Sequence, residues 1–334
     1  MALRISILDQ SPVISGQSPA QAVQATLELA RAADALGYHR YWLAEHHAIA
    51  ALADPCPEVL LARLGADTRR MRVGTGGVLL PYYSPFKVAE VFRMLEALYP
   101  GRIDLGLGRA PGGDARTSHA VAGGQFPTAD DFPNRVWELV SHLDGTLPDD
   151  HPHRRVRLQP AGETAPQVWL LGSSDYSGAL AAQMGLRFAF AHFINGRGGD
   201  QVTRAYREQF QPSARESAPA AIVCVFVICA PDDAEAERLA ACIDLRRLHM
   251  ALGRDTPVPT DEEAARHAYT EEERRFVLSQ RDRAVIGSPE TCLRALTALA
   301  ERYAADEVMA LTITGDYATR LRSYELLAKA FGLG

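Results

Sequence analysis

An acid and two histidines follow a short apolar run in the N-terminal part of the chain. The run at residues 41–44 leads directly into Glu45, His46 and His47. Histidine is the side chain whose ordinary pKa lies near neutral pH, so it can carry protons under physiological conditions. If the run is a strand of an α/β barrel, these side chains lie at its C-terminal edge, where such barrels build active sites. The segment therefore indicates proton-transfer chemistry, with a histidine pair that only caps a strand as the alternative.

Adjacent glycines interrupt another apolar run. Thr75, Gly76 and Gly77 lie within a strand expected at residues 71–80. Glycine weakens a strand, so two neighbouring glycines indicate that the backbone comes close to another group there. A simple β-bulge is the alternative explanation.

Serines cluster where a strand is expected to run into a helix. Ser173, Ser174 and Ser177 follow the apolar run at residues 168–171. Backbone N–H groups and hydroxyls at a helix N-terminus bind phosphate well, and an arginine can pair with phosphate through two hydrogen bonds. An ordinary helix cap, which needs only one serine, is the alternative.

Strand and helix signals alternate along the whole chain. Continuous apolar runs are typical of parallel strands covered on both faces. Residues 18–21 form a capping box with proline at the first helical position, and Gly37 suits the end of that helix. Ser-Pro pairs at residues 84–85 and 288–289 open two further helices. The expected strands are residues 3–8, 40–44, 71–80, 103–107, 168–171, 187–191, 222–229 and 307–313.

Eight strands in this order fit either a closed barrel or an open doubly wound sheet. The length of 334 residues favours the barrel. The nearest match to a dinucleotide-binding fingerprint, at residues 106–111, has proline in place of the third glycine and follows the fourth strand. We therefore expect an α/β fold with one (β/α)8 TIM barrel and residues 1–334 as a single domain. Long insertions are expected after strands 4 and 7, at residues 109–165 and 230–286.

The composition excludes several classes of partner. With 47% hydrophobic and 23% charged residues, the chain has the composition of a soluble globular protein. A net charge of −6 gives no electrostatic reason to expect nucleic acid or an anionic membrane as a partner. No apolar segment is long enough for a signal peptide or a membrane span. We therefore expect a cytoplasmic protein.

Cysteines and histidines give no metal signal. The five cysteines are widely spaced and form no CxxC pair, which indicates reduced thiols without a disulfide frame or a zinc site. The histidines at positions 119, 142, 151 and 153 have no metal-like spacing with acids or cysteines. No metal site is expected.

Four segments, in this order, resemble the luciferase-like flavin-dependent monooxygenases, the family of bacterial luciferase. They are residues 42–47 (WLAEHH), 73–81 (VGTGGVLLP), 102–109 (RIDLGLGR) and 171–177 (LGSSDYS), and residues 305–309 are similar to that family's last strand. The match spans the whole chain, and the set is specific although no single piece is. The resemblance implies an α/β barrel that is usually dimeric and uses reduced FMN, or in one branch the deazaflavin F420.

The resemblance also implies roles for the strand-end residues. His46 matches the position of the family's catalytic base. Glu45 resembles an acid that lies near the flavin, although it could instead orient His46 or accept backbone hydrogen bonds. His47 is expected to be structural.

For the cofactor, the resemblance implies contacts from three places in the chain. The Gly76–Gly77 bond matches a non-prolyl cis peptide that lies against the flavin ring, next to Thr75. Arg109 matches an arginine at the flavin phosphate. Luciferase has glutamate at the position of Ser173, which leaves the details of phosphate binding open. The remaining phosphate contacts are expected from Ser173, Ser174 and Ser177.

The leading hypothesis is therefore an FMN-dependent oxidoreductase, a monooxygenase that forms a homodimer. It would take FMNH2 from a separate flavin reductase and use O2 to oxygenate a small organic substrate through a C4a-peroxyflavin. The alternatives are an F420-dependent hydride-transfer enzyme and a non-catalytic flavin-binding protein. Glu45 and His46 argue against the second alternative, because a binding module needs no proton carrier. Light emission is not expected, because nothing in the chain identifies an aldehyde pocket.

Overall fold

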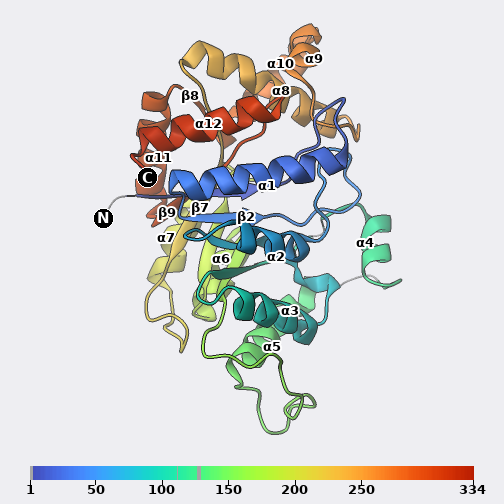
Figure 1. Cartoon of the computed structure of the whole chain (residues 1–334), viewed down its shortest axis with the longest axis vertical. Helices are drawn as coiled ribbons and strands as arrows, with labels where there is room; N and C mark the ends of the chain where they lie inside the picture. The colour runs from blue at the N-terminus through green and yellow to red at the C-terminus, as the bar shows by residue number, and fades with distance from the viewer. Residues whose placement is uncertain (1–2, 111, 126–128) are drawn as a thin grey trace.

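A ring of eight parallel strands forms the centre of the fold, with helices around it (Figure 1). The structure is a computed structural model that describes residues 3–110, 112–125 and 129–334, so Pro111 of the fingerprint-like segment lies outside the described residues. The last ring strand pairs with both the first and the seventh, which closes a TIM barrel as predicted. The ring strands are β1 (Arg4–Asp9), β2 (Arg40–Leu43), β3 (Arg72–Leu79), β4 (Ile103–Gly108), β5 (Gln167–Gly172), β6 (Arg187–Ala191), β7 (Ala221–Cys229) and β9 (Glu307–Leu311).

Each predicted helix start is confirmed by its cap. The Ser18 hydroxyl accepts a hydrogen bond from the Gln21 backbone N–H, and the Gln21 side-chain Oε1 accepts one from the Ser18 backbone N–H, so the expected capping box is present. Ser84 and Ser288 cap their helices in the same way through their side chains. The helices of the ring are α1 (Pro19–Leu36), α2 (Pro57–Asp67), α3 (Pro85–Leu98), α6 (Asp175–Gln183), α7 (Gly199–Glu208), α11 (Pro289–Tyr303) and α12 (Tyr317–Ala330).

Both long insertions lie where they were expected. The segment after β4 holds α4 (Ala115–Val121) and α5 (Phe132–Asp144), and the segment after β7 holds α8 (Asp233–Ala251), α9 (Asp261–Arg266) and α10 (Glu271–Ser279). A short strand, β8 (Ala284–Gly287), was not predicted. It pairs with β7 outside the ring, and its apolar run is too short to be distinguished from a loop by pattern alone.

Two apolar cores lie on the two faces of the ring. One fills the space between strands and helices, and the other fills the barrel interior with Leu8, Trp42, Trp169 and Met309 among its members. Trp42 and Trp169 meet edge to face with ring centres 5.4 Å apart. A Cβ on Gly76 would lie 2.7 Å from Leu8 Cδ1 and 3.1 Å from Trp42 Cε3. Glycine in β3 therefore makes room for the tryptophan that fills the barrel.

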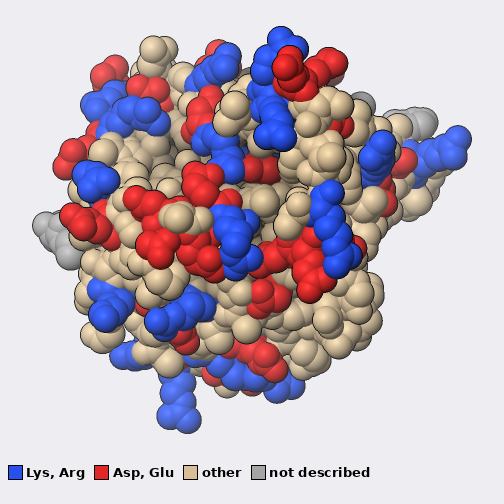
Figure 2. Space-filling view, turned by 90° about the horizontal axis from the view of Figure 1, so that it is seen from above, with Lys and Arg blue, Asp and Glu red and all other residues tan. Residues whose placement is uncertain are grey.

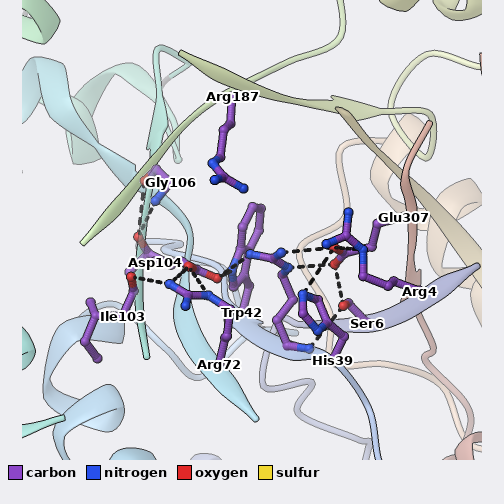
Figure 3. A network of polar contacts seen from close by, with 12 residues as sticks. Arg4, Ser6, His39, Trp42, Arg72, Ile103, Asp104, Gly106, Arg187 and Glu307 are labelled. Carbon is purple, nitrogen blue, oxygen red and sulfur yellow. Dashed lines mark hydrogen bonds and ion pairs between the residues drawn. The ribbon is translucent and has the colours of Figure 1, made fainter. Parts of the chain in front are cut away.

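A buried ion network closes the N-terminal end of the barrel interior (Figure 3). The Arg40 guanidinium donates to Glu307 Oε1 at 2.7 Å and to Asp104 Oδ2 at 2.6 Å, and all three side chains are buried. Asp104 also accepts hydrogen bonds from Trp42 Nε1 at 2.9 Å and from Arg72 Nε at 2.8 Å. Burial raises the pKa of Asp104, but the charges of Arg40 and Arg72 outweigh it and hold that pKa below its usual value. The network ties β2, β3, β4 and β9 together across the barrel.

None of the described helices is both long and apolar enough to cross a membrane. On the face seen in Figure 2, lysine and arginine side chains are interspersed with aspartate and glutamate and form no basic stripe.

The ion network predicts a large loss of stability for Asp104→Asn. The substitution leaves the buried Arg40 with one carboxylate partner in place of two, and breaking a buried ion pair costs about 3–5 kcal/mol. Urea unfolding of the two proteins measures this loss. The exposed pair of Arg322 and Glu325, 2.9 Å apart, provides the control. Glu325→Gln is expected to cost less than about 1 kcal/mol, and equal losses in the two variants would contradict the assignment.

Candidate active site

The acid that follows β2 lies at the C-terminal end of the barrel, opposite the ion network. Glu45 is buried and accepts hydrogen bonds from the Leu79 backbone N–H at 2.9 Å and the Tyr83 hydroxyl at 2.6 Å. Its Oε1 also lies 2.8 Å from Nε2 of His47. The suggestion that Glu45 orients His46 is therefore wrong, because its histidine partner is His47. The alternative that it accepts a backbone hydrogen bond is confirmed.

The His46 side chain takes no part in the hydrogen bonds of Glu45 and His47. Its buried Nδ1 has no hydrogen-bond partner among the described residues, and its backbone N–H donates to the carbonyl of Asp54 at 3.0 Å. Burial, together with the charge of Arg246, lowers the pKa of His46 to about 4. The expectation of a near-neutral pKa was wrong, because it took no account of burial or of a charge two hundred residues away. The imidazole is neutral at pH 7 and can accept a hydrogen bond or a proton.

A second titratable group beside His46 was missed in the sequence. Asp54 is buried, its Oδ1 accepts from the Cys56 backbone N–H at 3.1 Å, and its Oδ2 has no partner among the described residues. Burial raises the pKa of Asp54 to about 7, and the negative charges of Asp9, Glu58 and Glu45 add to the effect. A lone aspartate in a loop carries no signal of this kind, because its titration depends on acids from other elements.

The glycine pair of β3 adopts the geometry that the resemblance implied. The peptide bond between Gly76 and Gly77 is cis, and the register of β3 against β4 shifts between Thr75 and Val78. Thr75 is fully buried, and its hydroxyl is engaged by the Gly106 backbone N–H at 3.1 Å and carbonyl at 3.2 Å. Thr75 therefore joins β3 to β4 beside the cis peptide, and its role in cofactor binding remains a prediction.

Arg109 and the serines meet at the ends of the adjacent strands β4 and β5. The guanidinium carbon of Arg109 lies 4.3 Å from the ring centre of Tyr176, in the first turn of α6. Ser174 is the N-cap of α6, but its side chain makes no capping hydrogen bond. Ser177 donates to the Ser174 carbonyl at 2.9 Å, and the Ser173 carbonyl accepts from the Asn195 amide at 3.1 Å. The ordinary-cap explanation of the serines is therefore not supported.

This donor set fits the phosphate of a flavin nucleotide. The exposed Arg109 lies beside Tyr176 at the start of α6, where the Ser174 side chain forms no cap, although the Tyr176 backbone N–H donates to Asp175 Oδ1 at 2.8 Å. Backbone N–H groups at a helix N-terminus and the helix dipole attract anions, and arginine adds charge-assisted hydrogen bonds. Asp175, also in the first turn of α6, is the one unfavourable charge in this set. His46, the cis peptide and this donor set all lie at the C-terminal ends of the ring strands.

A separate histidine cluster lies away from this end of the barrel. Nδ1 of His153 is 3.0 Å from Glu138 Oε1, and Nε2 of His142 is 3.6 Å from the same oxygen. Potential ligand atoms of Glu138, His151 and His153 all lie within 4.8 Å of one another. These histidines have no metal-like spacing in the sequence, and the contacts with Glu138 arise because the loop after α5 folds back on that helix. The absence of a metal remains a prediction.

Sequence comparison places this geometry in a known family. Residues 1–306 match the family model for luciferase-like monooxygenases. The chain belongs to that family. The Bacillus subtilis protein YceB is 45% identical over 98% of this chain and 99% of its own length. The N-acetyl-S-alkylcysteine monooxygenase of B. subtilis is 34% identical, with 98% of each protein covered.

Solved structures of luciferase-like proteins and of more distant barrels confirm the fold. The crystal structure of apo-MsnO8 has a TM-score of 0.92 at 40% identity and covers 99% of both chains. An FMN complex of the oxygenating constituent of 3,6-diketocamphane monooxygenase from Pseudomonas putida has a TM-score of 0.74 at 20% identity, with 99% and 98% covered. An F420-dependent secondary alcohol dehydrogenase has a TM-score of 0.69 at 14% identity, with 99% of each chain covered. The last two show likeness of fold alone.

The raised pKa of Asp54 predicts a pH-dependent gain of stability in Asp54→Asn. The folded pKa of about 7 lies above the ordinary 3.8, so the carboxyl costs nothing below about pH 4 and destabilises as pH rises through 7. Asparagine keeps the acceptor for the Cys56 N–H without the charge. Urea unfolding is expected to show a gain of up to about 4 kcal/mol at pH 8 and little at pH 4. A gain that does not change with pH would show that Asp54 is not the titrating group.

Proposed function

We propose that the protein is an FMN-dependent monooxygenase that takes FMNH2 from a separate flavin reductase and uses O2 to oxygenate a small organic substrate. The observation that carries the proposal is the phosphate-binding donor set of Arg109 and the α6 N-terminus, on the same barrel end as His46. As part of the same proposal, residues 1–334 act as one domain in a cytoplasmic homodimer.

Each element of the site has a part in this reaction. When bound, the reduced flavin supplies the electrons with which O2 is activated. Arg109, Ser173, Ser174 and Ser177 would bind its phosphate, and the backbone at Gly76–Gly77 would contact its ring system.

Two neighbouring side chains have different roles in the proposed reaction: His46 transfers a proton, and Glu45 holds the ends of the strands in position. The neutral imidazole of His46 accepts or returns a proton at the reacting centre. Glu45 joins the end of β3, through the Leu79 N–H, to His47 and Tyr83. This arrangement keeps β2 and β3 in register where the ring system lies.

Two alternatives use the same barrel. F420 also carries a phosphate, and an F420-dependent dehydrogenase shares the fold. Titrations of the protein with FMN and with F420 distinguish the two cofactors. A non-catalytic flavin-binding protein would bind FMN but give no oxygenated product.

The phosphate assignment predicts weaker FMN binding in Arg109→Met. Removing a charge-assisted hydrogen bond to phosphate costs about 1.5–3 kcal/mol, which corresponds to a roughly 10- to 100-fold loss of affinity. Quenching of flavin fluorescence measures the affinity. Riboflavin, which lacks the phosphate, is the control and is expected to bind both proteins equally. A parallel loss for riboflavin would show that Arg109 does not act on the phosphate.

The oxygenation itself is tested with a flavin reductase, NADH, FMN and 18O2. Thioethers of N-acetylcysteine are the first substrates to screen, because the relative at 34% identity is named for them. Mass spectrometry is expected to show one 18O atom in the product. His46→Ala is expected to lower the product formed per NADH by about 10²–10⁴-fold. Unchanged product formation in this variant would remove His46 from the mechanism.

A further inference from the structure

Three arginine side chains are buried among the described residues, and they differ in how their charge is compensated. Arg40, Arg246 and Arg320 are 1%, 7% and 2% exposed. Arg40 pairs with two carboxylates, and Arg320 Nη2 donates to Asp9 at 2.6 Å. Arg246 forms no ion pair with any described residue within 4.0 Å. A buried charge without a partner is strongly unfavourable, so proteins rarely keep one that has no use.

The contacts of Arg246 do not replace a carboxylate. Nη1 donates to the sulfur of Met250 at 2.7 Å, and a thioether is a weak acceptor. Nε has no hydrogen-bond partner among the described residues. Asp255 is the acid whose charge acts on Arg246, but its Oδ1 accepts from the Ala50 backbone N–H at 2.9 Å. Burial accordingly lowers the pKa of Arg246, whereas the pKa values of Arg40 and Arg320 are raised.

Arg246 lies beside the candidate active site. It belongs to α8, the first helix after β7, and the segment that follows α8 contacts the loop after His46, because Asp255 Oδ1 accepts from the Ala50 backbone N–H. The charge of Arg246 contributes to the lowered pKa of His46. The next residue, Arg247, also has part of its guanidinium without a hydrogen-bond partner. Its guanidinium lies 4.6 Å from the ring centre of Phe226, while its Nη2 has no partner within the described part of the chain. Phe226 packs against the apolar core of the barrel interior and meets Phe193 edge to face at 5.7 Å.

We propose that Arg246 binds a carboxylate of the organic substrate, with Phe226 and the Arg247 stem beside its apolar part. The substrate class is then small organic acids with an apolar or aromatic body. A carboxylate forms two parallel hydrogen bonds with a guanidinium and supplies the missing counter-charge. The inference rests on the proposed function in one respect, because it places the oxidised group of the acid near His46.

The first test is the stability of Arg246→Met in the absence of any ligand. Methionine keeps the length of the side chain and removes the charge, so the variant is expected to unfold about 2 °C or more above the wild type. Arg322→Met, at an exposed and paired arginine on α12, is the matched control and is expected to leave the melting temperature unchanged. A lower melting temperature for Arg246→Met would mean that Arg246 is a structural residue and would overturn the proposal.

The second test compares acids with their uncharged isosteres by calorimetry. Hexanoate and benzoate are titrated against hexanamide and benzamide, into protein with and without FMN. In the wild type, at least one acid is expected to bind about 10-fold or more tightly than its amide, which corresponds to one charge-assisted contact. The ratio is expected to fall to about one in Arg246→Met and to persist in Arg322→Met. Equal binding of acid and amide, no binding of either acid, or a ratio that survives in Arg246→Met would each overturn the proposal.

The third test separates a substrate site from a flavin contact. FMN is expected to bind Arg246→Met as tightly as it binds the wild type in the fluorescence titration. A 10-fold loss would assign Arg246 to the flavin and overturn the proposal. Failure of the wild type to bind FMN would refute the proposed function instead, while the acid–amide comparison would still decide whether Arg246 is an anion site.

Discussion

The buried charges around Arg40 set the conditions for the rest of the barrel. An ion network in the interior is stable only if every partner is in place, and here the partners come from β2, β3, β4 and β9. Asp104 also accepts from the Trp42 indole, so the network fixes the tryptophan that fills the middle of the barrel. Strand register at the N-terminal end is thereby set by charge. The C-terminal end of the barrel, which the network does not involve, carries polar atoms without hydrogen-bond partners among the described residues, such as His46 Nδ1 and Asp54 Oδ2.

Packing transmits this constraint to the candidate active site. Leu8 and Trp42 crowd position 76, where a Cβ would lie 2.7 Å from Leu8 Cδ1 and 3.1 Å from Trp42 Cε3, so glycine suits β3 where it passes the barrel interior. The backbone of β3 then turns through the cis bond at Gly76–Gly77, and Thr75 replaces the lost ladder contacts by bonding both backbone groups of Gly106. The glycines proposed to lie against the flavin are therefore also required by the core. Catalytic geometry and packing cannot be changed separately here.

The sequence predicted those features that depend on neighbours along the chain. The eight ring strands, the capping box at Ser18 and both insertions follow from local patterns, and the resemblance supplied the cis peptide. The errors and omissions concern groups that are brought together only by folding. The pKa of His46 depends on Arg246, and the loop after α5 brings His153 to Glu138. Spacing in the chain could not reveal these pairs, because each requires the path of a long connection.

The short strand β8 gives the second insertion an unusual attachment. β8 runs parallel to the last residues of β7, with Ala284 opposite Phe226 and Gly287 opposite Cys229. The segment 230–283 therefore leaves the barrel at the end of β7 and returns beside the same strand. The whole segment is thus anchored at both ends to one strand, and it carries Arg246 and Arg247 but none of the groups assigned to the flavin. Because both of its ends are attached to β7, the segment 230–283 can be replaced by a different one without a change in the rest of the barrel. Substrate range could then diverge in evolution while the cofactor site and the folding core stay as they are.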